Sequence, residues 1–203
     1  MNAKRTPRSA SSRRQRAPRR LTLRISLRYI EPVIWREITV PDSYSLLQLH
    51  RCIQLVFDWL DYHLFEFQVG SRSFEAPDPE AAGEDAGRTT LAELGLKAGS
   101  SLLYVYDMGD VWEHDIHVQA IETISSEDEL DLLAYVVDGA RAAPPEDVGG
   151  PPGYGRLLLA LKRGSHDDDA DLIEWAGLGF DPELFDRRSQ NHALVLATAW
   201  GVI

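Results

Sequence analysis

Two hydrophobic segments meet at an acidic turn in the stretch Tyr104-Val105-Tyr106-Asp107-Met108-Gly109-Asp110-Val111-Trp112-Glu113-His114. Residues 102–107 predict one β-strand and residues 111–121 predict the next, so residues 107–110 predict the turn of a hairpin. A turn uses Asp to accept backbone N–H groups and Gly to adopt a positive φ. This role accounts for one Asp, whereas a second Asp followed by Trp112 and His114 also suits a ligand site. Both interpretations stay open from the sequence.

The segments before this hairpin predict the element order of a β-grasp-like mixed sheet. Alternating apolar and polar residues predict strands at 21–29, 33–40 and 63–69, with a short further strand ending near Phe74. Between the second and third of these strands, residues 45–48 form a capping box that predicts the start of one helix. The apolar stripe of that helix is expected to comprise Leu46, Leu49, Ile53, Val56, Phe57 and Leu60.

Beyond the hairpin the chain is expected to be mainly helical, at about 154–162, 169–175 and 182–200. Asp181 followed by Pro182 predicts the N-cap and the first position of the last helix. The expected fold class is therefore α+β, a β-grasp-like mixed sheet with one packed helix, an added C-terminal strand and a helical cap.

The predicted domain organisation is a basic tail followed by one folded domain. Residues 1–20 contain eight Lys or Arg residues, no acid and no apolar periodicity, which predicts a disordered tail. Residues 21–203 are expected to form a single domain, with a β-grasp-like core at 21–122 and a mainly helical extension at 123–203. This domain holds the remaining 13 Lys or Arg residues and all 32 Asp or Glu residues, so its formal charge is 13 − 32 = −19.

The tail can be interpreted as a solvated leader or as a segment that makes weak, non-specific contact with nucleic acid through residues 4–20. Phosphates would repel the acidic domain, so any such binding must depend on the tail.

No apolar run is long enough to span a membrane, and the single cysteine, Cys52, cannot form an internal disulfide. We therefore expect a cytoplasmic protein without membrane contact, in which Cys52 is a buried, unreactive thiol.

A second segment also combines carboxylates with glycines, in Pro144-Pro145-Glu146-Asp147-Val148-Gly149-Gly150-Pro151-Pro152-Gly153-Tyr154-Gly155. Glycines and prolines exclude a regular strand or helix around Glu146 and Asp147. Gly149 and Gly150 could present backbone N–H groups to a small anion, although no phosphate-loop signature follows them. The segment is either a rigid linker between sheet and helices or part of a binding site.

Arg36 shares a strand face with apolar residues and is expected to be buried, so its charge needs a partner. The expected partner is a carboxylate from the 107–110 or 146–147 segment, and the alternative is an anionic ligand held by the guanidinium.

His63 and His114 are predicted to point inward on their strands. No histidine pair has a tight metal-ligand spacing, so the sequence predicts no metal site and no cofactor.

Further motifs accompany these two segments. They are Pro32-Val33-Ile34-Trp35-Arg36, Leu49-His50, Trp59, His63-Leu64-Phe65-Glu66-Phe67, Phe180-Asp181-Pro182-Glu183 and Asn191. With the two segments above, they resemble the plasmid pRiA4b Orf-3-like family over roughly residues 21–195. Ala143 and Val148 stand where relatives often have cysteine, and Asp58 stands where a glycine is usual. Some relatives are labelled resolvases of mobile elements, but this chain lacks an activated serine among basic residues and a C-terminal helix-turn-helix.

The family has no established biochemistry, so the resemblance implies a fold and a site rather than a reaction. The predicted function is a non-catalytic binding or interaction module, with a protein partner and an accessory role to a mobile element. The alternative is an enzyme, with or without a metal, that uses the carboxylate and histidine cluster at 107–114 and 146–147. We expect the two loops to meet beside Trp59 or His63. The candidate ligand-binding residues are Arg36, Trp59, His63, Asp107, Asp110, Trp112, His114, Glu146, Asp147 and Tyr154.

Overall fold

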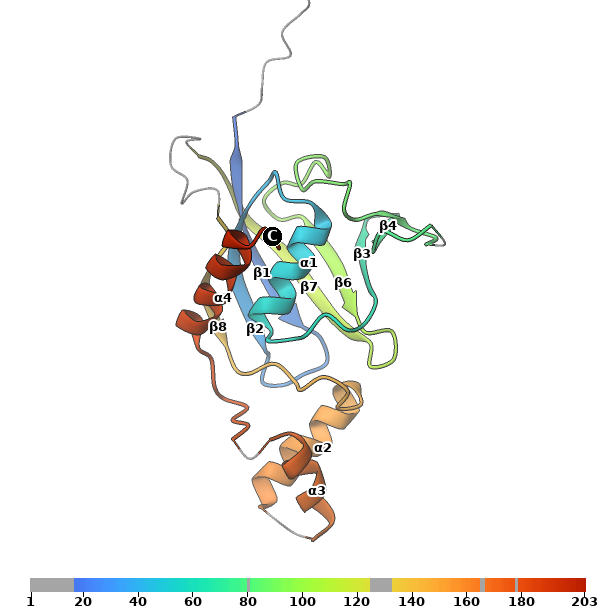
Figure 1. The fold of residues 1–203 in the computed structure, drawn as a ribbon, viewed down its shortest axis with the longest axis vertical. Helices are drawn as coiled ribbons and strands as arrows, with labels where there is room; N and C mark the ends of the chain where they lie inside the picture. The colour runs from blue at the N-terminus through green and yellow to red at the C-terminus, as the bar shows by residue number, and fades with distance from the viewer. Residues whose placement is uncertain (1–16, 80, 125–132, 165–166, 178) are drawn as a thin grey trace, which may run out of the picture.

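The computed structural model describes residues 17–79, 81–124, 133–164, 167–177 and 179–203, and in these ranges it has an α+β fold (Figure 1). The elements, in chain order, are β1 (Arg19–Leu27), β2 (Trp35–Pro41), α1 (Leu46–Val56), β3 (Phe65–Val69), β4 (Arg72–Glu75), β5 (Glu84–Asp85), β6 (Ser101–Tyr106), β7 (Trp112–Thr123), β8 (Tyr135–Ala140), α2 (Gly150–Arg163), α3 (Asp167–Trp175) and α4 (Arg187–Ala199). The predicted α+β class and mixed sheet are confirmed.

The described strands form one sheet in the order β5-β4-β3-β6-β7-β1-β2-β8. Neighbouring strands pair antiparallel except β4 and β5, which pair parallel. The added strand β7 lies between β1 and β6, so these two strands run in the same direction without touching each other. The finer label of a β-grasp-like core stays a prediction.

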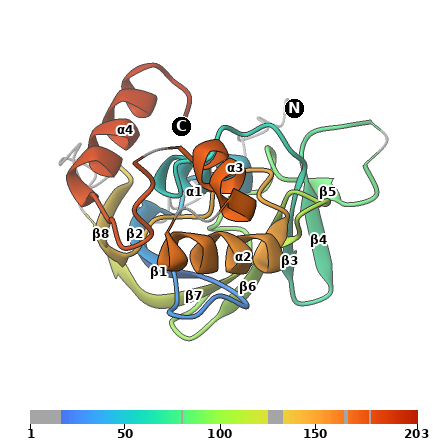
Figure 2. The same cartoon turned by 90° about the horizontal axis from the view of Figure 1, so that it is seen from below.

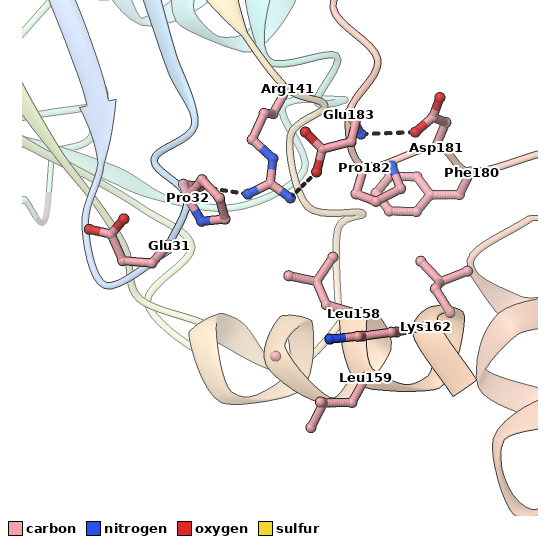
Figure 3. Close-up of a pocket in the computed structure, with 12 residues that line it drawn as sticks. Glu31, Pro32, Arg141, Leu158, Leu159, Lys162, Phe180, Asp181, Pro182 and Glu183 are labelled. Atoms are coloured by element: carbon pink, nitrogen blue, oxygen red, sulfur yellow. Dashed lines mark hydrogen bonds and ion pairs between the residues drawn. The ribbon is translucent and has the colours of Figure 1, made fainter. Parts of the chain in front are cut away.

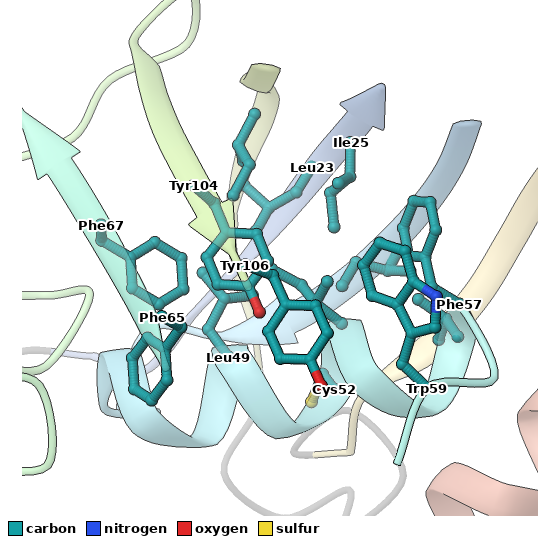
Figure 4. Close-up of a cluster of buried hydrophobic side chains, with 14 of the residues drawn as sticks. Leu23, Ile25, Leu49, Cys52, Phe57, Trp59, Phe65, Phe67, Tyr104 and Tyr106 are labelled. Carbon is teal, nitrogen blue, oxygen red and sulfur yellow. The ribbon is translucent and has the colours of Figure 1, made fainter. Parts of the chain in front are cut away.

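Alternation of side chains explains why one face of the sheet carries the core. Leu21, Leu23, Ile25 and Leu27 of β1 are buried, while the residues between them are partly exposed. Helices α1 and α4 lie over the buried face (Figure 1). Figure 4 shows aromatic rings from β3, from β6 and from the segment that follows α1, beside Leu23 and Ile25 of β1 in this core. Burial also raises the pKa of the Cys52 thiol to about 12, as expected for an unreactive cysteine.

Helix α1 begins at the predicted capping box, in which Ser45 and Gln48 satisfy each other's backbone N–H groups. The prediction that its apolar stripe extends to Leu60 is wrong, because the helix ends at Val56 and Asp58 takes a positive φ of 55°. Leu60 therefore lies outside the helix with 62% of its surface exposed.

The mainly helical extension also contains a strand that the sequence did not predict. β8 pairs with β2, whose other edge is already paired with β1, so the second edge of β2 is covered. The predicted start of the last helix at Asp181-Pro182 is wrong as well. Helix α4 begins at Arg187. Its N-cap is Asp186, whose side chain accepts hydrogen bonds from the amides of Arg188 and Ser189.

Helices α2 and α3 pack against each other at one end of the sheet, away from α1 and α4 (Figures 1 and 2). No helix in the described ranges is both long and apolar enough to cross a bilayer.

Residues 1–16 lie outside the described residues, so the predicted disorder there stays a prediction. Arg19 and Arg20, which the sequence assigned to the tail, lie in β1. Arg19 Nε is 2.8 Å from Asp42 Oδ2, and Arg20 Nη2 is 3.2 Å from Glu122 Oε2. The folded region therefore begins slightly earlier than expected.

Candidate functional site

The two motif loops meet, as the sequence predicts, at the start of α2. The amide of Gly149 donates a hydrogen bond to Asp110 Oδ2 at 3.1 Å. Gly150 has a φ of 64°, and a Cβ atom there would lie 2.5 Å from the carbonyl oxygen of Asp110. Glycine is therefore required for the close approach of the loops. The anion that faces Gly149 is the Asp110 carboxylate of the chain itself, which indicates a structural role for this pair.

Trp59 lies beside the joined loops and ties them to the end of α1. Its indole Nε1–H donates to the carbonyl oxygen of Pro144 at 2.9 Å. Its ring stacks on Tyr106 with a centroid distance of 5.0 Å and meets His114 edge-on at 5.3 Å. Because the indole is buried with its polar atom satisfied, Trp59 acts as a fixed support in this geometry.

Glu146 is held by two donors from different segments. Its Oε1 accepts a hydrogen bond from the Tyr106 hydroxyl at 2.6 Å, and its Oε2 accepts one from the Leu60 amide at 3.1 Å. The pKa of Tyr106 is raised, mainly by burial and to a smaller extent by the hydrogen bond to Glu146. The phenol therefore stays protonated and acts as a donor. Both carboxylate oxygens of Glu146 are thus engaged, one by a side-chain hydroxyl and one by a backbone amide.

The segment 59–64 is anchored through its backbone. The Asp61 amide donates to Gln54 Oε1 at 3.1 Å and the Tyr62 amide donates to the Tyr106 hydroxyl at 3.1 Å. The Leu64 carbonyl accepts a hydrogen bond from the Asp107 amide at 2.9 Å. Together with the Leu60 amide, these bonds fix the backbone to the core and to both motif loops.

Three apolar side chains of this anchored segment point to solvent. Leu60, Tyr62 and Leu64 are 62%, 71% and 67% exposed, and Met108 of the adjoining hairpin turn is 48% exposed. We call these four residues the apolar rim. Leu64 and Met108 also line one shallow hollow of about 450 Å³. The rim was not predicted from the sequence, because Leu60 was expected on the buried stripe of α1.

The buried side chain of His50 also holds segment 59–64, through a contact with Asp61. His50 Nδ1 lies 2.8 Å from the Tyr104 hydroxyl, and His50 Nε2 lies 2.7 Å from Asp61 Oδ1. Burial lowers the pKa of His50 more strongly than Asp61 raises it, so the contact with Asp61 is a hydrogen bond of a neutral ring. Gln54 donates to the same hydroxyl at 3.0 Å and completes this network.

His63, Asp107 and Asp147 bring three possible metal ligands together from three segments. His63 Nε2 lies 3.7 Å from Asp107 Oδ2 and 3.3 Å from Asp147 Oδ1. One ligand atom of each residue lies within 4.8 Å of the others, which makes this group able to hold a cation. The predicted inward position of His63 is wrong, because β3 starts only at Phe65 and the imidazole is 29% exposed beside the loops.

Arg36 is fully buried, as predicted, but its predicted carboxylate partner is wrong. Its guanidinium donates to the backbone carbonyls of Val56, Trp35 and Ala140 at 2.8, 2.9 and 3.0 Å. It also lies about 5 Å from the centroids of two phenylalanine rings. The carbonyl of Val56 belongs to the end of α1, where helix carbonyls carry partial negative charge and lack partners. Burial lowers the pKa of Arg36 to about 10.

Trp112, His114 and Tyr154 are also buried and face away from any ligand in solvent. His114 Nδ1 donates to the Trp112 carbonyl at 3.0 Å, and burial lowers the pKa of His114 to about 3. The ring is therefore a neutral core histidine. Of the ten candidate residues, His63, Asp107 and Asp147 are the ones whose possible ligand atoms lie close together.

A larger hollow of about 870 Å³ lies between α2 and the segment 180–183 (Figure 3). Arg141 forms part of its wall, where it donates to the Pro32 carbonyl and pairs with Glu183, both at 2.7 Å. Lys162 faces the hollow together with Asp181 and Glu31, so the walls carry both signs of charge. This mixture selects no single class of ligand, and the hollow lies apart from the joined loops.

The chain is similar to a protein family, to a curated protein and to a solved structure. A family model described as "Plasmid pRiA4b ORF-3-like protein" matches residues 19–189. The uncharacterized protein y4hQ of Sinorhizobium fredii (strain NBRC 101917 / NGR234) is 33% identical over 159 residues, which cover 76% of this chain and 79% of that protein. The crystal structure of a protein of unknown function, MM3350 from Methanosarcina mazei Go1, superimposes with a TM-score of 0.76 at 33% identity. That match covers 85% of this chain and 98% of the other.

Proposed function

The chain belongs to the plasmid pRiA4b ORF-3-like family, and for this member we propose a non-catalytic binding function in which the apolar rim contacts a protein partner. The observation that carries the proposal is the contrast within segment 59–64, whose backbone is anchored while the side chains of Leu60, Tyr62 and Leu64 face solvent. Exposed apolar groups that are gathered in one place are typical of interaction sites.

Anchoring matters because it lowers the cost of binding. A flexible loop loses conformational entropy when a partner orders it, whereas a fixed loop has already lost that freedom on folding. The Leu60 and Tyr62 amides are held by Glu146 and Tyr106, and these two residues hydrogen-bond to each other. The motif residues of both loops therefore support the rim, which explains their dense arrangement without requiring them to touch a ligand.

The same hydrogen bonds count against the enzyme alternative. A general acid or base must reach the proton that it transfers. Asp110 and Glu146 are engaged with backbone amides, and His114 is a buried neutral ring. These groups hold the fold in place, so their arrangement favours binding over catalysis.

The charge of the domain indicates the kind of partner. Asp61 and Asp147 stand close to the rim with 48% and 68% of their side chains exposed, and residues 21–203 carry a formal charge of −19. A partner with an apolar patch and a basic border suits this surface, because opposite charges speed association and exclude acidic competitors. The predicted accessory role to a mobile element remains part of this proposal.

The test is site-specific photo-crosslinking of the full chain in cells that produce it naturally. A photoreactive phenylalanine analogue replaces Tyr62 or Leu64, and the matched control replaces Leu184, which is 58% exposed in a different segment. We expect one protein to be captured from both rim positions and not from position 184. Leu60→Asp should abolish that capture while the free energy of unfolding changes by less than about 0.5 kcal/mol, because the side chain is exposed.

Equal capture from positions 62, 64 and 184 would mean that the rim is ordinary surface. Capture that persists in Leu60→Asp would also contradict the proposal.

A further inference from the structure

His63, Asp107 and Asp147 carry an inference that does not depend on the apolar rim. We propose that His63 Nε2 and the carboxylates of Asp107 and Asp147 bind a divalent transition-metal ion, for which Zn²⁺ is the probe of choice. The three ligands come from the segment before β3, from the β6–β7 turn and from the loop before α2. Their separation along the chain explains why no ligand spacing was visible in the sequence.

The distances match those between ligands of one ion. Zinc binds imidazole nitrogen and carboxylate oxygen at about 2.0–2.2 Å, so two ligands of a tetrahedral ion lie roughly 3.4 Å apart. His63 Nε2 lies 3.3 Å from Asp147 Oδ1 and 3.7 Å from Asp107 Oδ2. A direct hydrogen bond would be shorter, at about 2.7–3.2 Å. The third pair, Asp107 and Asp147, lies within 4.8 Å.

The ligand atoms also lack other partners. His63 Nε2 is enclosed and makes no hydrogen bond in the described part of the chain. Asp107 is 9% exposed, and its Oδ1 accepts a hydrogen bond from the Gly109 amide at 2.8 Å while its Oδ2 faces His63. Among the described residues, no Lys or Arg pairs with either carboxylate. The two carboxylates thus face the imidazole of His63, and a bound cation would balance their negative charge.

The ligand types indicate which ion would bind. One imidazole and two carboxylates suit zinc and similar transition metals, whereas calcium and magnesium prefer sites made of oxygen alone. The Gly109 amide fixes Asp107 from outside the ligand set, as supporting hydrogen bonds do in metal sites. Three protein ligands leave a fourth position open for water or for a group from a bound molecule.

The test is a Zn²⁺ titration of the untagged full chain by competition with a chromogenic chelator. We expect one ion per chain, with at least tenfold weaker affinity in Asp147→Asn and in His63→Gln. His192→Gln on the exposed face of α4 is the matched control and should bind zinc as the parent does. Asp147 is 68% exposed, so its substitution tests the site without endangering the fold.

Cobalt substitution provides a second readout, because the visible spectrum of bound Co²⁺ reports a four-coordinate nitrogen and oxygen site. A chain that binds no zinc at stoichiometric levels would overturn the proposal. So would zinc binding that Asp147→Asn and His63→Gln leave unchanged. Neither outcome affects the crosslinking test of the rim, so the two proposals can fail separately.

Discussion

Tyr106→Phe should loosen segment 59–64 and lower the stability of the whole protein. The substitution keeps the ring in its stack with Trp59 but removes a hydroxyl that donates to Glu146 at 2.6 Å and accepts from the Tyr62 amide at 3.1 Å. A hydrogen bond to a charged group contributes about 1.5–3 kcal/mol, and the stranded Tyr62 amide adds to the loss. We therefore expect the free energy of unfolding to fall by about 2–3 kcal/mol.

Urea denaturation measures the global effect and amide hydrogen exchange measures the local one. A loss of about 2 kcal/mol that is confined to the segment would raise exchange at the Leu60 and Tyr62 amides by roughly 30-fold. Tyr29→Phe is the matched control, because Tyr29 also donates to a glutamate, Glu113 at 3.2 Å, but is 72% exposed. It should cost less than about 0.5 kcal/mol. If Tyr106→Phe left both amides as protected as in the parent, segment 59–64 would not depend on this network.

The remaining predictions concern the core, the loop junction and the tail. The folded-state pKa of His114 is about 3 and its unfolded value is 6.5, so the unfolded state binds more protons and the unfolding free energy falls as pH drops below 6.5. At pH 5 the loss is about 2 kcal/mol, and a His114→Gln variant whose stability depends on pH as steeply as the parent's would contradict this. Arg36→Lys should cost about 2–3 kcal/mol in urea denaturation, because one ammonium cannot reach carbonyls on α1 and β8 together; a neutral effect would refute the assignment. Gly150→Ala should lower the melting temperature, because its Cβ would lie 2.5 Å from Asp110 O, whereas Gly155→Ala, with open space around it, should not. If residues 4–20 contact DNA, binding should weaken steeply with salt and disappear in a chain starting at Ala17, and equal affinity without the tail would exclude that contact.

Much of the fold could be predicted from side-chain alternation and helix capping. β1 and α1 follow directly from such patterns, because each buries one face and the residues that face solvent are polar. β8 could not be predicted in this way, because its apolar residues do not alternate with polar ones and its position depends on the edge that β2 leaves open. The same holds for the end of α1, where Asp58 stops the helix by a positive φ rather than by a glycine or proline.

The candidate site was predictable in its place but not in its chemistry. Both motif loops join segments of one core, so their meeting at Asp110 and Gly149 follows from topology. Sequence patterns show that Arg36 must be buried, but they do not show that backbone carbonyls would accept its hydrogen bonds. The grouping of His63 with Asp147 depends on where α1 ends and where β3 begins, which is a property of tertiary packing.

The central position of β7 has a consequence for folding during synthesis. While the ribosome makes the first 111 residues, β1 and β2 can pair with each other, and β3, β4 and β6 can pair among themselves. The two groups have no common hydrogen-bonded edge until β7 emerges and pairs with β1 and β6. Until then the edges of β1 and β6 that β7 will cover are open, and such edges pair readily with other chains. The interval before residues 112–123 leave the ribosome is therefore the stage at which this protein most needs protection from aggregation.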